Sequence, residues 1–257
     1  MGRYWDVDVA RGVAMAMVVL YHLVYDLDNF GGYPIESTAG FWAAFANASA
    51  SAFLFLAGLS LALSFARDRG AGLRGWVLFG KYARRGARIF LWGMLITLVF
   101  LALGYGYVIF CILHLIGLSV ILAYPLLGLR FANLILGLAV VAAGVYVGAE
   151  RLVMDGAAGI LLAPLGVVPE GVFMPDYRPL LPWFGVVLLG LFFGNALYLT
   201  WRKNATAPTG CPNGPPVGHP PPYAAPLAFL GRHTLSVYLV HQPVLIATLW
   251  ALGVIRF

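Results

Sequence analysis

Long apolar runs alternate with short polar stretches along the whole chain. Runs of bilayer-spanning length occupy residues 9–26, 41–66, 86–103, 107–127, 131–149, 180–201 and 234–252, since a helix needs about 20 apolar residues to cross the hydrocarbon core. The pattern therefore predicts an all-α polytopic membrane protein, a bundle of about seven transmembrane helices. A further apolar piece at 157–169 is short and interrupted by two prolines, which predicts a re-entrant or interfacial segment.

The composition also indicates a multi-pass protein of the cell membrane. Hydrophobic residues make up 61% of the 257 residues and charged residues only 10%, and a water-soluble domain of this size cannot hide so much apolar surface. We expect one transmembrane domain over residues 1–257, with the Pro/Gly-rich stretch 205–226 as a cytoplasmic linker. The lipid bilayer is its expected partner, and a homodimer is compatible with so small a bundle.

The basic residues predict the orientation of the bundle, because they favour the cytoplasmic side of a membrane. One stretch between the second and third apolar runs holds seven of them: Arg67, Arg69, Arg74, Lys81, Arg84, Arg85 and Arg88. If this loop is cytoplasmic, the N-terminus lies inside, and only Arg151, Arg178 and Arg256 fall on the outer side. The net charge of +6 then reflects membrane topology. No nucleic-acid motif accompanies it, so no nucleic-acid partner is expected.

Two ionisable side chains share the first apolar run. Arg11 and His22 are eleven residues apart, which is about 16 Å along a helix and close to three turns, so both point to the same side. Ionisable groups inside a membrane span are costly and mark a functional site. Asp8 can neutralise Arg11 as an i,i+3 pair, which is compatible with ligand contact by the arginine. An arginine that only reaches for the cytoplasmic interface is the other interpretation.

The role of His22 is open to two interpretations from sequence. An imidazole near the outer end of the helix can act as a general base, or as a nucleophile that carries an acyl group. Asp26, one turn later, can orient it. The alternative is an interfacial histidine that is hydrogen-bonded to a neighbouring carbonyl.

Polar side chains also interrupt the last apolar run. His241 and Gln242 directly precede Pro243, and proline removes a hydrogen bond from a helix. Such breaks are tolerated where they line a cavity, so the two side chains are candidate donors to the oxyanion of an acyl-transfer reaction. A histidine that only satisfies the freed carbonyls is an equally good interpretation.

Two further sets of residues are candidates for substrate contact. Asp176, Arg178 and Trp183 lie in a segment that leads into the sixth apolar run from outside. They form either an aromatic anchor at the interface or a contact for an acceptor. The arginines of the 67–88 stretch suit the phosphates of a cytosolic nucleotide-containing donor, although no standard nucleotide-binding glycine motif is present. No metal site is expected.

Three passages resemble a known family. Asp8-Val-Ala-Arg11-Gly12 together with His22 resembles the Arg-x10-His signature on the first catalytic helix of integral-membrane acyltransferases. The passages 176–185 (DYRPLLPWFG) and 230–243 (LGRHTLSVYLVHQP) are similar to later blocks of one branch, the heparan-α-glucosaminide N-acetyltransferase catalytic domains and their prokaryotic relatives. The resemblance spans residue 3 to about residue 247.

This resemblance implies a bundle that takes acetyl from cytosolic acetyl-CoA and passes it to an acceptor on the far side, such as an amino sugar or a surface glycan. It makes His22 and Arg11 the histidine and arginine of the signature. In the heparan-acting member an asparagine stands in place of His22 and the histidine lies in the following loop. The 26–40 loop of this chain contains no histidine, so acyl transfer is implied and heparan itself is not.

The expected function is therefore that of an acyl-CoA-dependent transmembrane acyltransferase, with His22, Arg11, Asp8, His241 and Gln242 at the reacting centre and Asp26, Asp176, Arg178 and Trp183 toward the acceptor. The donor phosphates are expected to meet Arg11, Arg74, Lys81, Arg84, Arg85 and Arg88. A small transporter or channel for an anionic or protonatable solute is the alternative, since buried Arg and His and a proline-broken helix occur there too. No internal repeat relates two halves of the chain.

Overall fold

The computed structural model describes residues 4–104, 108–150, 152–154, 156–169, 176–198, 200 and 218–255. The chain divides into two compact units. The first consists of Met1–Leu56 and Asn213–Phe257, and the second of Ala57–Pro212. Among the described residues, helices form both units, apart from one short β ladder in the second.

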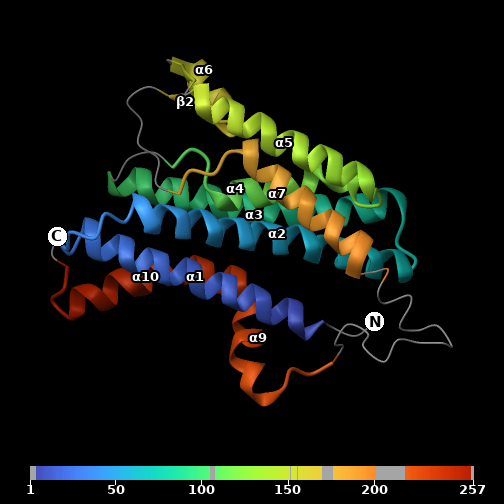
Figure 1. The fold of residues 1–257 in the computed structure, drawn as a ribbon, viewed down its shortest axis with the longest axis horizontal. Helices are drawn as coiled ribbons and strands as arrows, with labels where there is room; N and C mark the ends of the chain where they lie inside the picture. Colours follow the sequence, from blue (N-terminus) through green and yellow to red (C-terminus); the bar gives the residue numbers. More distant parts are fainter. Residues whose placement is uncertain are drawn as a thin grey trace. The chain divides into compact units, whose positions relative to one another are not determined.

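The first unit is built on the N-terminal helix. Its elements are α1 (Trp5–Asn29), the first part of α2 (Gly40–Gly70), a 3-10 turn η4 (Pro222–Ala224), α9 (Ala225–Arg232) and α10 (Thr234–Ala251). Both α9 and α10 pack against α1, although about 200 residues of sequence separate them from it (Figure 1). This packing brings the N-terminal helix and the C-terminal helices together.

Glycines allow α1 and α9 to cross at very close range. A Cβ placed on Gly12 of α1 would lie 2.0 Å from the carbonyl oxygen of Leu227. A Cβ placed on Gly231 of α9 would lie 1.7 Å from the carbonyl oxygen of Asp8. Backbone therefore packs directly on backbone at this crossing, an arrangement typical of helix pairs in membranes.

The second unit pairs α3 with α4 and α5 with α7, as Figure 1 shows. Its buried core joins Leu61 of α2, Tyr82 of α3, Val120 of α4 and Leu188 of α7. The elements are the rest of α2, α3 (Gly75–Leu103), α4 (Ile112–Leu122), η1 (Tyr124–Leu126), α5 (Phe131–Glu150), β1 (Val153–Met154), α6 (Gly156–Leu162), η2 (Ala163–Leu165), β2 (Val168–Pro169), α7 (Leu180–Phe193) and a π-helical turn η3 (Gly194–Tyr198).

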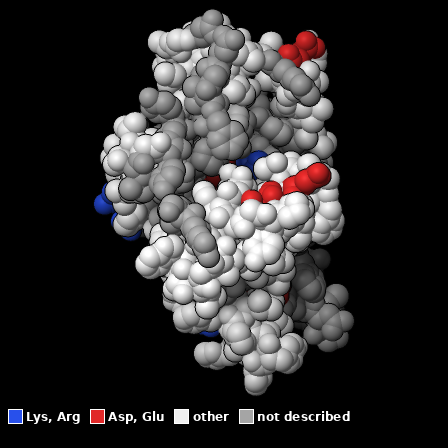
Figure 2. Space-filling view, turned by 90° about the vertical axis from the view of Figure 1, so that its left-hand side faces the viewer, with Lys and Arg blue, Asp and Glu red and all other residues white. Residues whose placement is uncertain are grey.

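Five helices are long and apolar enough to cross a membrane, which supports a multi-pass membrane protein. They are α1, α2, the stretch Gly75–Ala102 of α3, α5 and α10. Large apolar side chains stand on their surfaces, such as Phe131, which is 69% exposed, and most described atoms on the face in Figure 2 belong to uncharged residues. Two of the seven predicted spans, 107–127 and 180–201, contain shorter α-helices of 11 and 14 residues, α4 and α7.

The predicted loop between the second and third spans is wrong in its extent. The α2 helix continues to Gly70 and α3 begins at Gly75, so the connection is four residues long and most of the basic residues of 67–88 lie on helices. Hydropathy marks only the part of a helix that meets lipid. Arg and Lys favour helices nearly as well as Leu does, and their long side chains can reach the interface from the last turns inside it.

Two other predicted segments are partly visible. The 157–169 piece forms α6, η2 and β2, and β2 pairs in parallel with β1; a helix of seven residues is too short to cross a bilayer. Of the predicted 205–226 linker, residues 205–217 lie outside the described residues. Its end contains the η4 turn and the first residues of α9, and therefore is not a linker throughout.

Candidate functional site

Four polar side chains meet where α1 packs against α10. We call His22, Asp26, His241 and Gln242 the histidine cluster. The rings of His22 and His241 lie edge to face, with centroids 4.7 Å apart and planes at 84°. Gln242 Nε2 donates a hydrogen bond of 2.7 Å to Asp26 Oδ1. The sequence placed these residues on two helices at opposite ends of the chain, and the fold brings them together in the first unit.

Backbone carbonyls fix how both imidazoles are protonated when neutral. His22 Nδ1 lies 2.9 Å from the carbonyl oxygen of Val18, and His241 Nδ1 lies 2.6 Å from that of Tyr238. A carbonyl oxygen can only accept, so Nδ1 carries the proton in each ring and the lone pair is on Nε2. His22 is only partly buried, so its Nε2 suits a base that meets a ligand.

The cluster also contains buried acceptors in need of a donor. Asp26 is fully buried, and its Oδ2 has no hydrogen-bond partner among the described residues. The same holds for Gln242 Oε1. A buried polar atom left unpaired costs about 1–3 kcal/mol, so a ligand that brings N–H or O–H groups would recover this cost.

Arg11 is held at a second contact between the same helices. It donates a hydrogen bond of 2.6 Å to Thr234 Oγ1. Along α1 this contact lies about three turns before the contact of His22 with His241. Both side chains thus face α10, which confirms the predicted common side of the first helix. Since contacts advance along both helices in the same order, α1 and α10 run in the same direction (Figure 1). Asp8 is buried at the close crossing with α9.

Pro243 lies inside the last helix, where it can donate no backbone hydrogen bond but does not end the helix. The α10 helix continues through Pro243 from Thr234 to Ala251. His241 bonds to a carbonyl of its own helix, as the structural interpretation expects, while its ring still faces His22. Gln242 turns its amide nitrogen to Asp26, which leaves its buried oxygen as the free acceptor of the amide among the described residues.

A line of basic side chains follows one side of α3 in the second unit. Lys81, Arg84, Arg85 and Arg88, which we call the basic stripe, are exposed. They occupy positions i, i+3, i+4 and i+7 of the helix, so they share a face. Arg74 stands at the N-cap of the helix. Lys81 forms an ion pair of 2.6 Å with Asp68. The nearby Tyr82 hydroxyl also donates to that carboxylate, at 3.0 Å.

The segment before α7 forms a separate polar group in the second unit. The guanidinium of Arg178 stacks over the ring of Trp183 at 4.9 Å, and Arg178 Nε is buried without a hydrogen-bond partner among the described residues. The Arg178 amide donates to the carbonyl of Phe110 at 3.3 Å. Asp176 begins this stretch with a left-handed backbone, φ 54°.

Sequence reasoning missed two features of these sites. It did not foresee α9, although a proline at position 226 followed by an apolar stretch is a usual helix start. It also missed the partner of His114, whose Nδ1 accepts a hydrogen bond of 3.1 Å from the Cys111 amide at the start of α4. Cys111 is buried and forms no disulfide within the described residues, and its Sγ lies 3.3 Å from His114 Nδ1.

Comparison with protein families gives a match that covers nearly the whole chain. Residues 3–243 match the family described as heparan-alpha-glucosaminide N-acetyltransferase, catalytic. Comparisons with curated proteins and with solved structures gave no significant match. The matched range includes α1, α9 and the whole histidine cluster. This protein belongs to the heparan-α-glucosaminide N-acetyltransferase catalytic family, a family of membrane acetyltransferases.

Proposed function

We propose that this protein transfers an acetyl group from cytosolic acetyl-CoA to an amine or hydroxyl of an amino sugar or surface glycan at the outer face of the membrane. The observation that carries the proposal is the histidine cluster. It combines an imidazole lone pair on a partly buried ring with two buried oxygen atoms that have no donor in the described part of the chain. The family match supports acetyl transfer as the reaction.

His22 is proposed to act as the general base. Acetyl-CoA supplies a thioester, the activated form of the acetyl group. As the acceptor nitrogen or oxygen attacks the thioester carbonyl, His22 Nε2 takes the proton of the acceptor. The carbon–sulfur bond then breaks, and the CoA thiolate leaves and recovers that proton. The bond from Nδ1 to Val18 holds the ring in the required tautomer throughout.

Asp26 and Gln242 are proposed to position the acceptor. Their unpaired oxygen atoms can accept hydrogen bonds only from a group with N–H or O–H bonds. Amino sugars and other glycans are rich in such groups. An anionic solute without donors would meet two more acceptors here, so the cluster does not favour transport of an anion. His241, held by Tyr238, packs on His22 and keeps that ring in place.

Replacement of Asp26 by Asn tests this assignment. Asp26→Asn keeps the shape of the side chain but replaces one carboxylate oxygen with an NH2 group. We expect the KM for the acceptor to rise about tenfold, the effect of losing one hydrogen bond to a charged group, while the KM for acetyl-CoA stays the same. The assay is transfer of radiolabelled acetyl in proteoliposomes, with glucosamine as the acceptor probe.

Glu36→Gln is the matched control, because it removes one negative charge from an exposed position of the loop after α1. It should leave both KM values unchanged. If Asp26→Asn also changes neither value, Asp26 does not contact the acceptor. If no acetyl is transferred to glucosamine but a sugar without an amine is acetylated, the proposed mechanism stands and the acceptor group is a hydroxyl.

The basic stripe is proposed to bind the phosphates of acetyl-CoA, with Arg74 at the N-cap of the same helix as a further cation. Its exposed guanidinium groups fit phosphate in a bidentate manner. Removing one such contact costs about 1.5–3 kcal/mol, so we expect Arg84→Ala and Arg88→Ala each to weaken CoA binding roughly tenfold or more. Isothermal titration calorimetry with CoA in detergent measures this effect.

Arg130→Ala is the control for the stripe, since Arg130 is exposed but lies outside α3. Its affinity for CoA should equal that of the unmodified protein. Equal affinities for all three variants would remove the stripe from the donor site, and leave the role of His22 to be tested by itself.

The orientation of the chain is part of the same proposal. The N-terminus is proposed to lie in the cytoplasm, with seven crossings in which α4 and α7 complete the set. The positive-inside rule supports this, because Arg67, Arg69 and the basic stripe cluster at the connection between α2 and α3. The common direction of α1 and α10 fits an odd number of crossings.

A further inference from the structure

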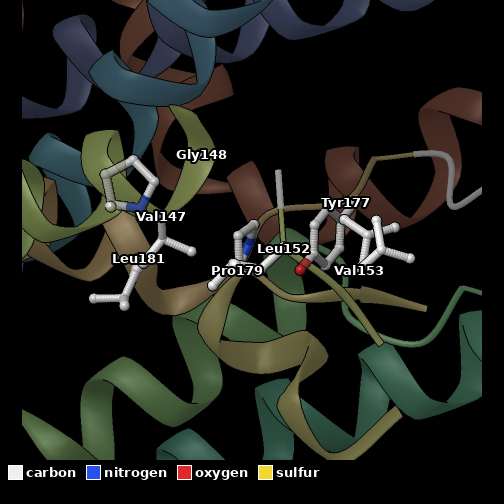
Figure 3. A pocket seen from close by; sticks show the side chains of 11 residues that line it. Val147, Gly148, Leu152, Val153, Tyr177, Pro179 and Leu181 are labelled. Atoms are coloured by element: carbon white, nitrogen blue, oxygen red, sulfur yellow. The ribbon is translucent and has the colours of Figure 1, made fainter. Parts of the chain in front are cut away.

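A cavity of about 400 Å³ lies in the second unit at the end of α5. Its walls come from the last turns of α5, the strands β1 and β2 and the start of α7. In Figure 3, Tyr177 and Val153 lie at one end of this cavity and Val147 and Leu181 at the other. The volume is within the range of about 300–1,000 Å³ that small-molecule sites occupy.

The described lining of the cavity favours an apolar ligand over a charged or sugar-like one. Among the residues that the structure describes, every lining residue is apolar or glycine except Tyr177. The Tyr177 hydroxyl already donates a hydrogen bond of 2.6 Å to the carbonyl of Ala163. Burial raises the pKa of Tyr177 to about 12, so this group stays neutral at physiological pH. A ligand with many hydrogen-bonding groups would lose its hydration without finding partners, whereas a hydrocarbon chain would not.

The cavity opens toward the region that lipid occupies. Leu152 and Val153 line it and are also 46% and 55% exposed. On the neighbouring turn of α5, Val145 and Tyr146 are exposed as well. Because α5 is long and apolar enough to cross a membrane, we expect Val145 and Tyr146 to face the bilayer. Leu152 and Val153 follow shortly after the end of this helix, so the exposed part of the lining lies next to the end of the span.

Glycine keeps the cavity open at one position. A Cβ on Gly148 would meet no atom within 4 Å, although Gly148 lines the cavity. Gly144, one turn earlier, has a different role, because its Cβ would lie 2.4 Å from Pro182 of α7. A side chain at 148 would thus extend into empty space, whereas one at 144 would push the helices apart.

We propose that this cavity binds one fatty-acyl chain of a membrane phospholipid. The occupant follows from the uncharged apolar lining, from the opening beside the lipid-facing side chains of α5, and from the position at the end of a span. A chain attached to a headgroup begins at that depth of the bilayer. The bound chain fills the space between α5, α7 and the β1–β2 ladder and stabilises this corner of the second unit.

The test is lipid retention by the full chain. The protein and two variants, Gly148→Phe and Val145→Phe, are reconstituted in vesicles of dioleoyl phosphatidylglycerol and extracted in detergent. Native mass spectrometry then measures the fraction of each protein that retains a bound phospholipid. We expect one phospholipid to stay bound to the unmodified protein and to Val145→Phe, which adds the same ring on the lipid-facing side of α5. Gly148→Phe fills the cavity and should lower the bound fraction at least fivefold.

A second measurement needs no variant. A phosphatidylglycerol with a diazirine in one acyl chain should label the segment around Leu152 and Val153 in a detergent extract from which loosely bound lipid has been removed. Equal lipid retention by all three proteins, or no label at this segment, would overturn the proposal. Retention of a prenyl-type lipid instead of phospholipid would also overturn it. Neither readout depends on acetyl transfer.

Discussion

His22→Ala is expected to lower the rate of acetyl transfer by a factor of about 10² to 10⁴, the range that a general base contributes. The variant loses the Nε2 lone pair that would take the acceptor proton, while the helix around it is unchanged. His22 is only partly buried, so its removal should not open a large cavity in the core. The rate is measured in proteoliposomes with radiolabelled acetyl-CoA, and folding by the melting temperature in detergent.

His233→Ala is the matched control, because His233 is an exposed histidine of the same unit whose Nδ1 also contacts a backbone carbonyl four residues earlier, that of Phe229 in α9. It should keep full activity. Full activity in His22→Ala would remove His22 from the mechanism. Single-turnover experiments without acceptor add a further distinction: a labelled protein would show that the imidazole carries the acetyl group itself.

Gly231→Ala is expected to destabilise the first unit by about 3 kcal/mol or more, at the upper end of overpacking effects. The added methyl group would lie 1.7 Å from the Asp8 carbonyl oxygen, and backbone atoms on both sides cannot move aside as a side chain could. Separation of α9 from α1 would also pull Thr234 away from Arg11. Thermal unfolding in detergent and retained transfer activity measure the two consequences.

Gly80→Ala serves as the control for this variant. Gly80 lies within a helix, and a Cβ there would meet no atom within 4 Å, so alanine should be neutral or slightly stabilising. If Gly231→Ala unfolds at the same temperature as Gly80→Ala, the close crossing of α1 and α9 does not contribute to stability as the structure indicates.

The sequence predicted the helical class and the first helix well, because those depend on hydropathy and on spacing. Arg11 and His22 face one side since eleven residues make about three turns, and contacts with Thr234 and His241 confirm it. The ends of helices were less predictable. Hydropathy falls where charged residues begin, yet α3 starts eleven residues before the predicted span, as Lys and Arg continue a helix easily.

Contacts between distant parts of the chain could not be predicted from the pattern. Asp26 was expected to orient His22, but its carboxylate bonds to Gln242, 216 residues away, and His22 bonds to Val18 within its own helix. Both choices depend on how α10 lies against α1, which no local signal encodes. Likewise, Lys81 was a candidate for phosphate contact, and its pairing with Asp68 follows from the short turn between α2 and α3.

The two polar contacts between α1 and α10 also limit how the helices can move. Arg11–Thr234 and Asp26–Gln242 are separated by fifteen residues of α1, about 22 Å along its axis. A piston-like slide by even one turn, about 5.4 Å, would rupture both bonds at once. These two bonds therefore oppose sliding of α1 along α10. We expect a ligand to reach the imidazoles when nearby side chains rotate, and not through a shift of one helix past the other.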